Sequence, residues 1–353
     1  MPPIFELRRE LGQVLTSRHL VYLDLNYWNH FCDLLLGDER DEIYSRLFDR
    51  LRAGVAEGTY ACPIEQTTLR ELLRQSDPRK RAATALAIDS LSLGGSAIAS
   101  RQDRMFIEFL RFVQRWGGGA VPTLPAPRLE MWTKAPFLLG HSQYAESDGP
   151  YGLPLSLTDS EMQRLWAGSF SQLLEELTQS PGEPFRYPQA LADGYNSSRR
   201  SVREQFPDYR TLYIEKVRGL LDHFHPLLGQ IHEYHRWRAQ PDGAPLSSVE
   251  RARFGNELAH DLLDLFRTND LSQQLPTIHI WADLMAHSLW SLSRSLTVND
   301  LYDFEHAMAA LPYYDTMLTD SGLNDILRSM DLQRSYETAV YYHPLDAMAN
   351  LPG

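Results

Sequence analysis

The sequence predicts an α/β fold in which a core of parallel strands and helices is interrupted by a large, mostly helical insertion. Two apolar runs support the core. HLVYLDL at 19–25 and TYACPI at 59–64 are nearly continuous, as in strands buried on both faces of a parallel sheet. A helix–strand–helix pattern returns at 297–330. Because strand–helix–strand units tend to share one sheet, we expect both ends of the chain to contribute to the same sheet.

The first part of the chain alternates these strands with helices. Apolar residues recur at helical spacing, and glycine or proline marks several of the ends. Helices are expected over 1–16, 27–37, 39–55, 67–75, 79–94 and 101–116.

The middle of the chain is richer in Pro and Gly. Irregular loops are expected at 117–158, 180–198 and 241–248, and helices near 159–178, 200–239, 247–267 and 276–295. The predicted organisation is a first part of the core at 1–116, a helical insertion with Pro/Gly-rich loops at 117–295, and the second part of the core with a C-terminal tail at 296–353.

Composition narrows the class of protein. The 353 residues carry a formal net charge of -12, whereas passive nucleic-acid binders are usually basic. The negative net charge argues less strongly against a metal-dependent nuclease. The carboxylates of such an enzyme hold divalent cations, and a phosphate can approach these cations. Two cysteines, no signal-peptide pattern and no long uncharged apolar run favour a cytoplasmic protein that does not span a membrane.

Acidic residues gather where the predicted strands and helices end. They are Asp24, Glu65, Glu71, Asp300, Asp303, Asp315 and Asp320. Ligands of parallel sheets bind beyond the carboxyl ends of the strands, so several of these side chains are expected to converge. Converging carboxylates repel one another unless a cation neutralises them, and all-oxygen sites select Mg²⁺ or Mn²⁺.

Each carboxylate also has an ordinary structural explanation. Asp24 could prepare the turn into the next helix, with Asn26 as the cap, and Glu71 could lie on a solvated helix face. Asp300 fits a capping role with Thr297 better than a ligand role. Asp315 and Asp320 are treated in the same way: the first could be an exposed residue at a strand start, and the second an N-cap.

Four acidic positions together resemble the PIN-domain family of nucleases. The matching segments are YLDLNYW in the first strand, LRELL on the helix after the second strand, DFEHAMAA opening a later helix, and MLTD at the end of the next strand. Carried over residue by residue, the resemblance places Asp24, Glu71, Asp303 and Asp320 at the acidic positions. Glu65 competes with Glu71 for the second of them. Asp300 and Asp315 are candidates for supplementary metal ligands.

The resemblance implies a PIN-like three-layer core and a hydrolase of phosphodiester bonds. The expected activity is that of an endoribonuclease that uses Mg²⁺ or Mn²⁺, with Asp24, Asp303 and Asp320 as direct ligands. The alternative is a catalytically inactive PIN-like scaffold or protein-interaction module. RNA is the expected substrate, and a protein inhibitor or antitoxin and a second copy of the chain are further candidate partners.

Three other residues are candidates for contact with the substrate. His306 follows Asp303 by three residues and could face the carboxylates and a phosphate, although a helix-packing role is equally compatible with its position. Asn26 follows Asp24 by two residues. Arg74 lies one turn beyond Glu71 and begins a series of basic residues.

Overall fold

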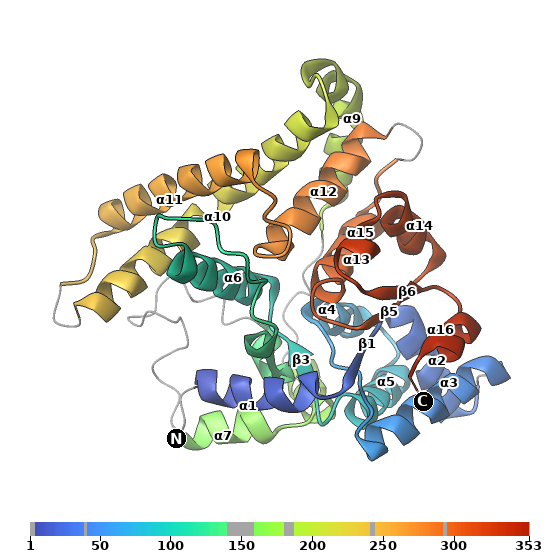
Figure 1. Cartoon of the computed structure of the whole chain (residues 1–353). Coiled ribbons are helices and arrows are strands. Elements are labelled where there is room, and N and C mark those ends of the chain that lie inside the picture. Colours follow the sequence, from blue (N-terminus) through green and yellow to red (C-terminus); the bar gives the residue numbers. More distant parts are fainter. Residues whose placement is uncertain are drawn as a thin grey trace.

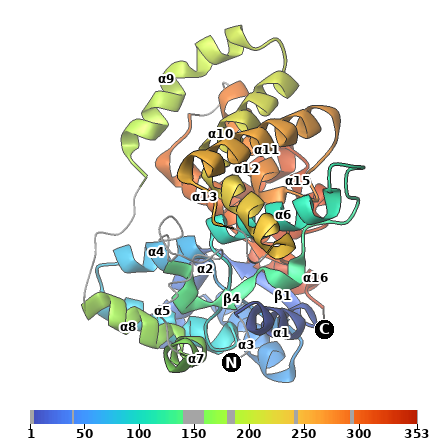
Figure 2. The ribbon, with the colours of Figure 1, turned by 90° about the vertical axis from the view of Figure 1, so that its left-hand side faces the viewer.

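The computed structural model describes residues 4–38, 41–139, 159–179, 187–240, 244–291 and 295–352. Figure 1 shows a small sheet and its covering helices in one half and a group of long helices in the other. Figure 2, turned by a right angle, shows α9–α12 above the part that contains α1–α5 and β1. The chain is therefore built from an α/β part and a helical part, in the order that the sequence predicts.

Four short strands form one parallel sheet. They are β1 (His19–Leu23), β2 (Tyr60–Ala61), β5 (Thr316–Leu318) and β6 (Ala339–Tyr341), in the order β2-β1-β5-β6. The predicted pairing of the two ends of the chain is confirmed, because β1 lies directly beside β5. From β1 the chain continues to β2 on one side, and the later strands lie on the other side.

The sheet has a core on each face. Leu20 and Tyr22 of β1 belong to a buried cluster with residues of α12, α13 and α14. Val21 and Leu23 belong to a second cluster with residues of α2, α3 and α5. Successive side chains of a strand point to opposite faces, so this division places helices on both sides of the sheet. Burial on both faces explains why the first strand is apolar at consecutive positions.

The helices follow the predicted ones closely in the first part of the chain. The α-helices are α1 (Ile4–Thr16), α2 (Leu25–Leu36), α3 (Glu42–Glu57), α4 (Gln66–Arg74), α5 (Pro78–Leu91), α6 (Arg101–Trp116), α7 (Asp159–Ala167), α8 (Phe170–Gln179), α9 (Gln189–Gln205), α10 (Tyr209–Ala239), α11 (Ser248–Thr268), α12 (Pro276–Trp290), α13 (Val298–Ala310), α14 (Ser321–Ser329), α15 (Leu332–Ser335) and α16 (Pro344–Asn350). Two short 3-10 helices, η1 (Arg128–Glu130) and η2 (Ala135–Leu139), flank β4 (Trp132–Lys134), which pairs antiparallel with β3 (Ser96–Ile98).

Several elements differ from the sequence-based prediction. The strand expected at 59–64 is only β2, two residues long, and the helix expected at 200–239 is divided between α9 and α10. The expected helix at 159–178 is divided into α7 and α8. The loop expected through residue 198 ends earlier, because α9 begins at Gln189, directly after Pro188. The strands β3, β4 and β6 were not predicted, and each is only three residues long. The expected loops at 140–158, 180–186 and 241–243 lie outside the described residues.

The boundary between the core and the insertion is not sharp at residue 116. Met105 and Phe109 of α6 lie in the hydrophobic cluster of the long helices, although the sequence places them in the core. Conversely, β4 lies in the predicted insertion but pairs with β3 of the core. The two parts are therefore joined by packing as well as by the chain.

Two glycines allow the two longest helices to approach each other closely. A Cβ atom at Gly229 of α10 would lie 2.3 Å from the Arg251 backbone oxygen, and one at Gly255 of α11 would lie 2.1 Å from the His225 backbone oxygen. Any side chain at either position would push the helices apart.

None of the helices in the described ranges has the length and the apolar composition needed to cross a membrane. Cys32 and Cys62 are buried and unpaired.

Candidate active site

The candidate site lies where β1 and β5 end side by side. Asp24 follows β1, and Asp320 follows β5 by two residues. The backbone N–H of Asp24 donates to the carbonyl oxygen of Leu318 at 3.0 Å, which extends the pairing of the strands up to the site. Because strand order reverses between β1 and β5, this is the edge at which parallel sheets commonly bind ligands.

Asp24 is buried at this edge of the sheet. It stands at the N-cap position of α2, and its backbone oxygen accepts hydrogen bonds from the helix, but its side chain makes no capping bond. Thr319 Oγ1 instead donates to Asp24 Oδ2 at 3.1 Å. The side chain is therefore held by Thr319, directly after β5, and the N-cap residue of α2 is Asp24 and not Asn26, which the structural explanation above had as the cap.

His306 of α13 lies at the centre of the buried side of the site. Its Nδ1 lies 3.0 Å from Glu65 Oε1, and its Nε2 lies 3.5 Å from Glu71 Oε2 and 3.9 Å from Asp24 Oδ1. Tyr22 Oη also contacts Nδ1. Glu65 and Glu71 therefore approach opposite nitrogens of one ring, and both of the competing acidic residues belong to the site.

The neighbours of His306 favour its protonated form. Burial alone would lower the pKa of His306, but Glu65, Glu71 and Asp24 raise it well above its ordinary value. Burial would likewise raise the pKa of Glu65, and the hydrogen bond and charge of His306 instead lower it to about 2. The side chain of His306 is 1% exposed, so direct contact with a substrate phosphate, which the sequence suggested, is not supported.

The outer side of the site carries Asp303 and Asp320. Burial raises the pKa of Asp303 to about 7, and the charges of Asp320, Asp24 and Asp300 add to this rise while His306 opposes it. Burial also raises the pKa of Asp24, to which the charges of Glu71 and Asp320 contribute. Asp320 is exposed, and its Oδ1 accepts the backbone N–H of Leu323 as the cap of α14. This capping was one explanation considered for Asp320, but it leaves the carboxylate within electrostatic range of Asp303.

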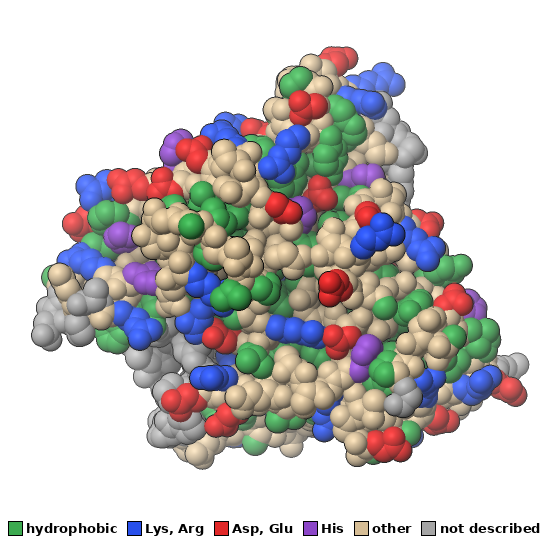
Figure 3. Space-filling model, viewed as in Figure 1, with side chains coloured by type: hydrophobic (Ala, Val, Ile, Leu, Met, Phe, Trp, Pro, Cys, Tyr) green, Lys and Arg blue, Asp and Glu red, His purple; other side chains and the backbone are tan. Residues whose placement is uncertain are grey.

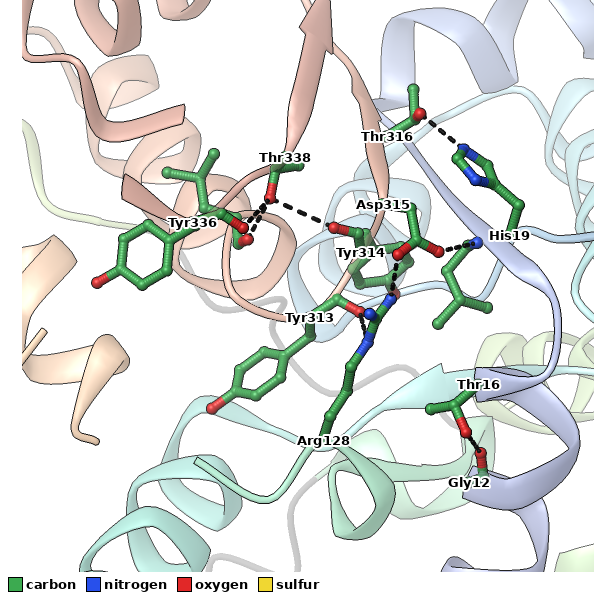
Figure 4. A network of polar contacts seen from close by, with 12 residues as sticks. Gly12, Thr16, His19, Arg128, Tyr313, Tyr314, Asp315, Thr316, Tyr336 and Thr338 are labelled. Carbon is green, nitrogen blue, oxygen red and sulfur yellow. Dashed lines mark hydrogen bonds and ion pairs between the residues drawn. The ribbon is translucent and has the colours of Figure 1, made fainter. Parts of the chain in front are cut away.

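The remaining predicted ligands have other partners. The Oδ2 atom of Asp300 accepts from the backbone N–H and the hydroxyl of Thr297 in a capping box, as the sequence favoured. Asp315 precedes β5 and therefore lies at the opposite end of the strand from Asp320. Figure 4 shows its carboxylate beside the guanidinium of Arg128. Arg128 Nη2 donates to Asp315 Oδ1 at 2.8 Å, and the backbone N–H of Leu20 donates to Oδ2 at 2.7 Å. The structure does not bring Asp315 to the cluster, because an aspartate before a strand lies at the amino edge of the sheet.

The two predicted substrate-binding side chains are exposed. Asn26 lies in the first turn of α2, two residues after Asp24. Arg74 lies at the end of α4, with its guanidinium 5.3 Å from the centre of the Tyr302 ring. Both could contact a ligand that reaches the carboxylates from solvent.

The donor atoms of the site fit a hard divalent cation by their chemistry. In addition to burial, the charges of Asp24 and Asp320 raise the pKa of Asp303, while the nearby His306 lowers it, and Glu71 Oε2 is buried 3.5 Å from His306 Nε2 without a regular hydrogen bond. Carboxylate oxygens are the preferred ligands of Mg²⁺ and Mn²⁺. In the present side-chain arrangement, however, no three His, Cys, Asp or Glu groups of the described ranges are positioned to hold a metal ion. Metal binding would therefore require these carboxylates to move closer together.

Two residues of the site were not predicted from the sequence. Thr319 fixes Asp24, and Tyr22 contacts His306. A signal existed for Thr319, because it follows a strand at the same sheet edge as Asp24. Tyr22 gave no such signal, since its position within an apolar strand predicts only burial.

Comparison with known proteins adds no relative: no family model, curated protein or solved structure matches the chain.

Proposed function

We propose that the chain is a metal-dependent nuclease that hydrolyses phosphodiester bonds, with single-stranded RNA as the substrate and a PIN-like arrangement of its carboxylates. One observation carries the proposal. Asp24 follows β1, Asp320 follows β5, and the charges of both contribute to the raised pKa of Asp303 on α13. A cluster of this kind favours a divalent cation.

Asp24, Asp303 and Asp320 would hold the cation, and Glu71 would complete the set. A cation bound there supplies Lewis-acid activation of water and neutralises charge on the phosphoryl group. Thr319 fixes the carboxylate of Asp24 by its hydrogen bond. His306 holds Glu65 and Glu71 from its two nitrogens, so the inner carboxylates keep one orientation. Asn26 and Arg74 lie outside, where a nucleic-acid strand would approach.

The surface charge is compatible with a site that binds nucleic acid through a few groups close to the cation. On the face shown in Figure 3, Lys and Arg side chains are interspersed with Asp and Glu. The net charge of -12 also disfavours broad attraction of a polyanion. Binding would then depend on the cation and on a few contacts near it.

Cleavage of a labelled single-stranded RNA tests the proposal. The wild type should cleave with Mg²⁺ or Mn²⁺ and not with EDTA. Asp24→Asn and Asp320→Asn keep the shape of the side chain but remove its charge, so the rate should fall by orders of magnitude while the fold persists. Asp325→Asn on α14 is the matched control, because Asp325 is exposed and should leave the rate unchanged. A double variant Asp24→Asn, Asp320→Asn that cleaves at the wild-type rate would exclude this mechanism.

A catalytically inactive scaffold is the second candidate. His306 favours it, because the imidazolium already compensates part of the carboxylate charge. Calorimetric titration with Mg²⁺ and Mn²⁺ separates the two candidates. Absence of binding at millimolar concentration would favour the scaffold, and binding that is lost in Asp24→Asn would favour the nuclease.

A further inference from the structure

A cavity of about 580 Å³ lies where the helical part meets the core. It is bounded by residues of α6, α9, α10, α12 and α13. Apolar side chains such as Met105, Phe224 and Met285 form most of its wall, and Trp281, Tyr187 and Tyr195 add aromatic rings. Its volume falls within the range of pockets that hold small organic ligands.

Charged side chains of both signs border this apolar space, and two of them are cationic. Arg101 of α6 lies with its guanidinium 5.6 Å from the centre of the Trp281 ring and is paired with Glu305. Lys216 of α10 also lines the cavity, and burial lowers the pKa of its ammonium group. An anionic group on a bound ligand would stabilise the charged ammonium group, which burial disfavours. Glu215 also lines the cavity, so the wall suits a flat, largely apolar body whose anionic group lies beside Arg101 or Lys216.

The cavity is connected to the candidate active site by contiguous side chains. Glu305 precedes His306 on α13 and accepts a hydrogen bond from Tyr187 Oη at 2.5 Å. The ring of Tyr187 packs edge-on against Tyr302, 5.1 Å between centres. Arg74 lies over the same Tyr302 ring, one turn of α4 beyond Glu71. Alternating cationic and aromatic groups thus run from the carboxylate cluster to the cavity.

We propose that this cavity receives one nucleobase of a single-stranded nucleic acid whose neighbouring phosphodiester lies at the carboxylate cluster. The second half of this statement rests on the proposed nuclease function. Aromatic rings stack on the face of any base, and Arg and Lys contact the backbone, which is how single strands are commonly held. A base inside a duplex is stacked and paired and would first have to be extruded. The cavity therefore selects single strands.

Filling the cavity provides the sharpest test. Gly219 of α10 lines it, and a Cβ atom built there meets no atom within 4 Å. Gly219→Leu should therefore occupy part of the space without a clash and without loss of helix stability. Gly194→Leu is the matched control, because Gly194 is also an exposed helical glycine with open space at its Cβ but does not line the cavity.

Binding is measured by calorimetry in EDTA with the full chain, so that neither metal nor cleavage is required. Adenosine and uridine 5′-monophosphate should bind, and ribose 5-phosphate should bind much more weakly because it has no base. Gly219→Leu should weaken nucleotide binding about tenfold or more, the size of one lost base stack, while Gly194→Leu should not. Circular dichroism confirms that both variants are folded.

The outcomes separate this inference from the proposed function. Nucleotide binding that is lost in Gly219→Leu, in a protein that never cleaves RNA, would keep the pocket and reject the nuclease. Metal-dependent cleavage that is unchanged in Gly219→Leu, or no nucleotide binding by the wild type, would reject the pocket and leave the nuclease standing. Equal binding of ribose 5-phosphate would also overturn it, because the phosphate alone would then be recognised.

Discussion

Glu65 and His306 form a buried ion pair in which Glu65 Oε1 lies 3.0 Å from His306 Nδ1, and the two side chains are 2% and 1% exposed. Neither charge has access to water, so each depends on the other. The pKa of Glu65 falls to about 2 and that of His306 rises, as expected for a mutual stabilisation of both charged forms. This ion pair forms the buried side of the candidate site.

Replacing His306 by Gln should destabilise the protein strongly. The change leaves Glu65 and Glu71 without their cation, and breaking a buried ion pair by removing one partner costs about 3–5 kcal/mol. Urea unfolding at pH 7 in EDTA measures the loss. His260→Gln is the control, since His260 pairs with Asp264 on the exposed face of α11 and should cost little. Equal, small losses in both variants would show that His306 is not charged in the folded protein.

The same pair predicts a loss of stability at acid pH. Glu65 has a pKa near 2 in the folded chain and about 4.3 when unfolded, so its contribution is present above that unfolded value and disappears as the pH falls toward 2. The contribution of His306, whose pKa is raised, is lost only as the pH rises through its folded value. The wild type should therefore lose more stability than His306→Gln between pH 5 and about 2. If the free energy of unfolding fell equally with pH in the two proteins, the electrostatic coupling between Glu65 and His306 would be contradicted.

The ionisation of Asp303 should make the stability of the protein depend on pH in the direction opposite to that of Glu65. Its folded pKa of about 7 lies above the unfolded value of about 3.9, so between these values the folded chain holds a proton that the unfolded chain has lost. Stability then decreases as the pH rises through this window. Asp303→Asn removes this effect, and its melting temperature in EDTA should rise relative to wild type between pH 4.5 and 8. If the difference in melting temperature between Asp303→Asn and wild type were constant across that range, or if Asp325→Asn showed the same rise, the raised pKa of Asp303 would be refuted.

The α/β core could be predicted because its signals are local. The continuous apolar pattern of β1 reflects burial on both faces, and strand ends at one sheet edge bring Asp24 and Asp320 together. The same rule, applied fully, also separates Asp315 from them, because it precedes β5. Its position at the start of that strand makes Asp315 a candidate by sequence, whereas the direction of the strand places it at the amino edge of the sheet.

The inner side of the site could not be predicted in the same way. A histidine on an apolar helix face has several roles, and only the tertiary structure brings Glu65 and Glu71 to the two nitrogens of His306. β6 was missed because a three-residue strand has too few positions to show a period, and its pairing with β5 supplies the stability. The cavity beside α10 is likewise formed by helices distant in sequence.

Metal binding, if the proposed function holds, should release protons. A cation binds carboxylates in their ionised form, and Asp303 is partly protonated near pH 7. Calorimetric titration with Mn²⁺ at pH 6.5 in two buffers of different ionisation enthalpy should show roughly one proton released or fewer, and less at pH 8.5. Asp303→Asn should abolish the buffer dependence. Binding heats that are independent of buffer in the wild type would argue that Asp303 is not part of the metal site.

Glu108 joins the helical part to the core, and its partner Tyr313 provides the last prediction. Thr277 of α12 donates to the buried carboxylate of Glu108 from its backbone N–H, and Tyr313, just before β5, donates from its hydroxyl at 2.5 Å. Burial raises the pKa of Glu108 to about 7, although these hydrogen bonds lower it. Tyr313→Phe removes a donor that favours the ionised form, so it should cost about 1–3 kcal/mol and cost more at pH 8 than at pH 5. Denaturant unfolding at both values measures this, with Tyr342→Phe as the control because that ring is 49% exposed. A loss of the same size at both pH values would mean that Glu108 does not ionise in the folded chain, and the hydroxyl of Tyr313 would then stabilise a neutral acid.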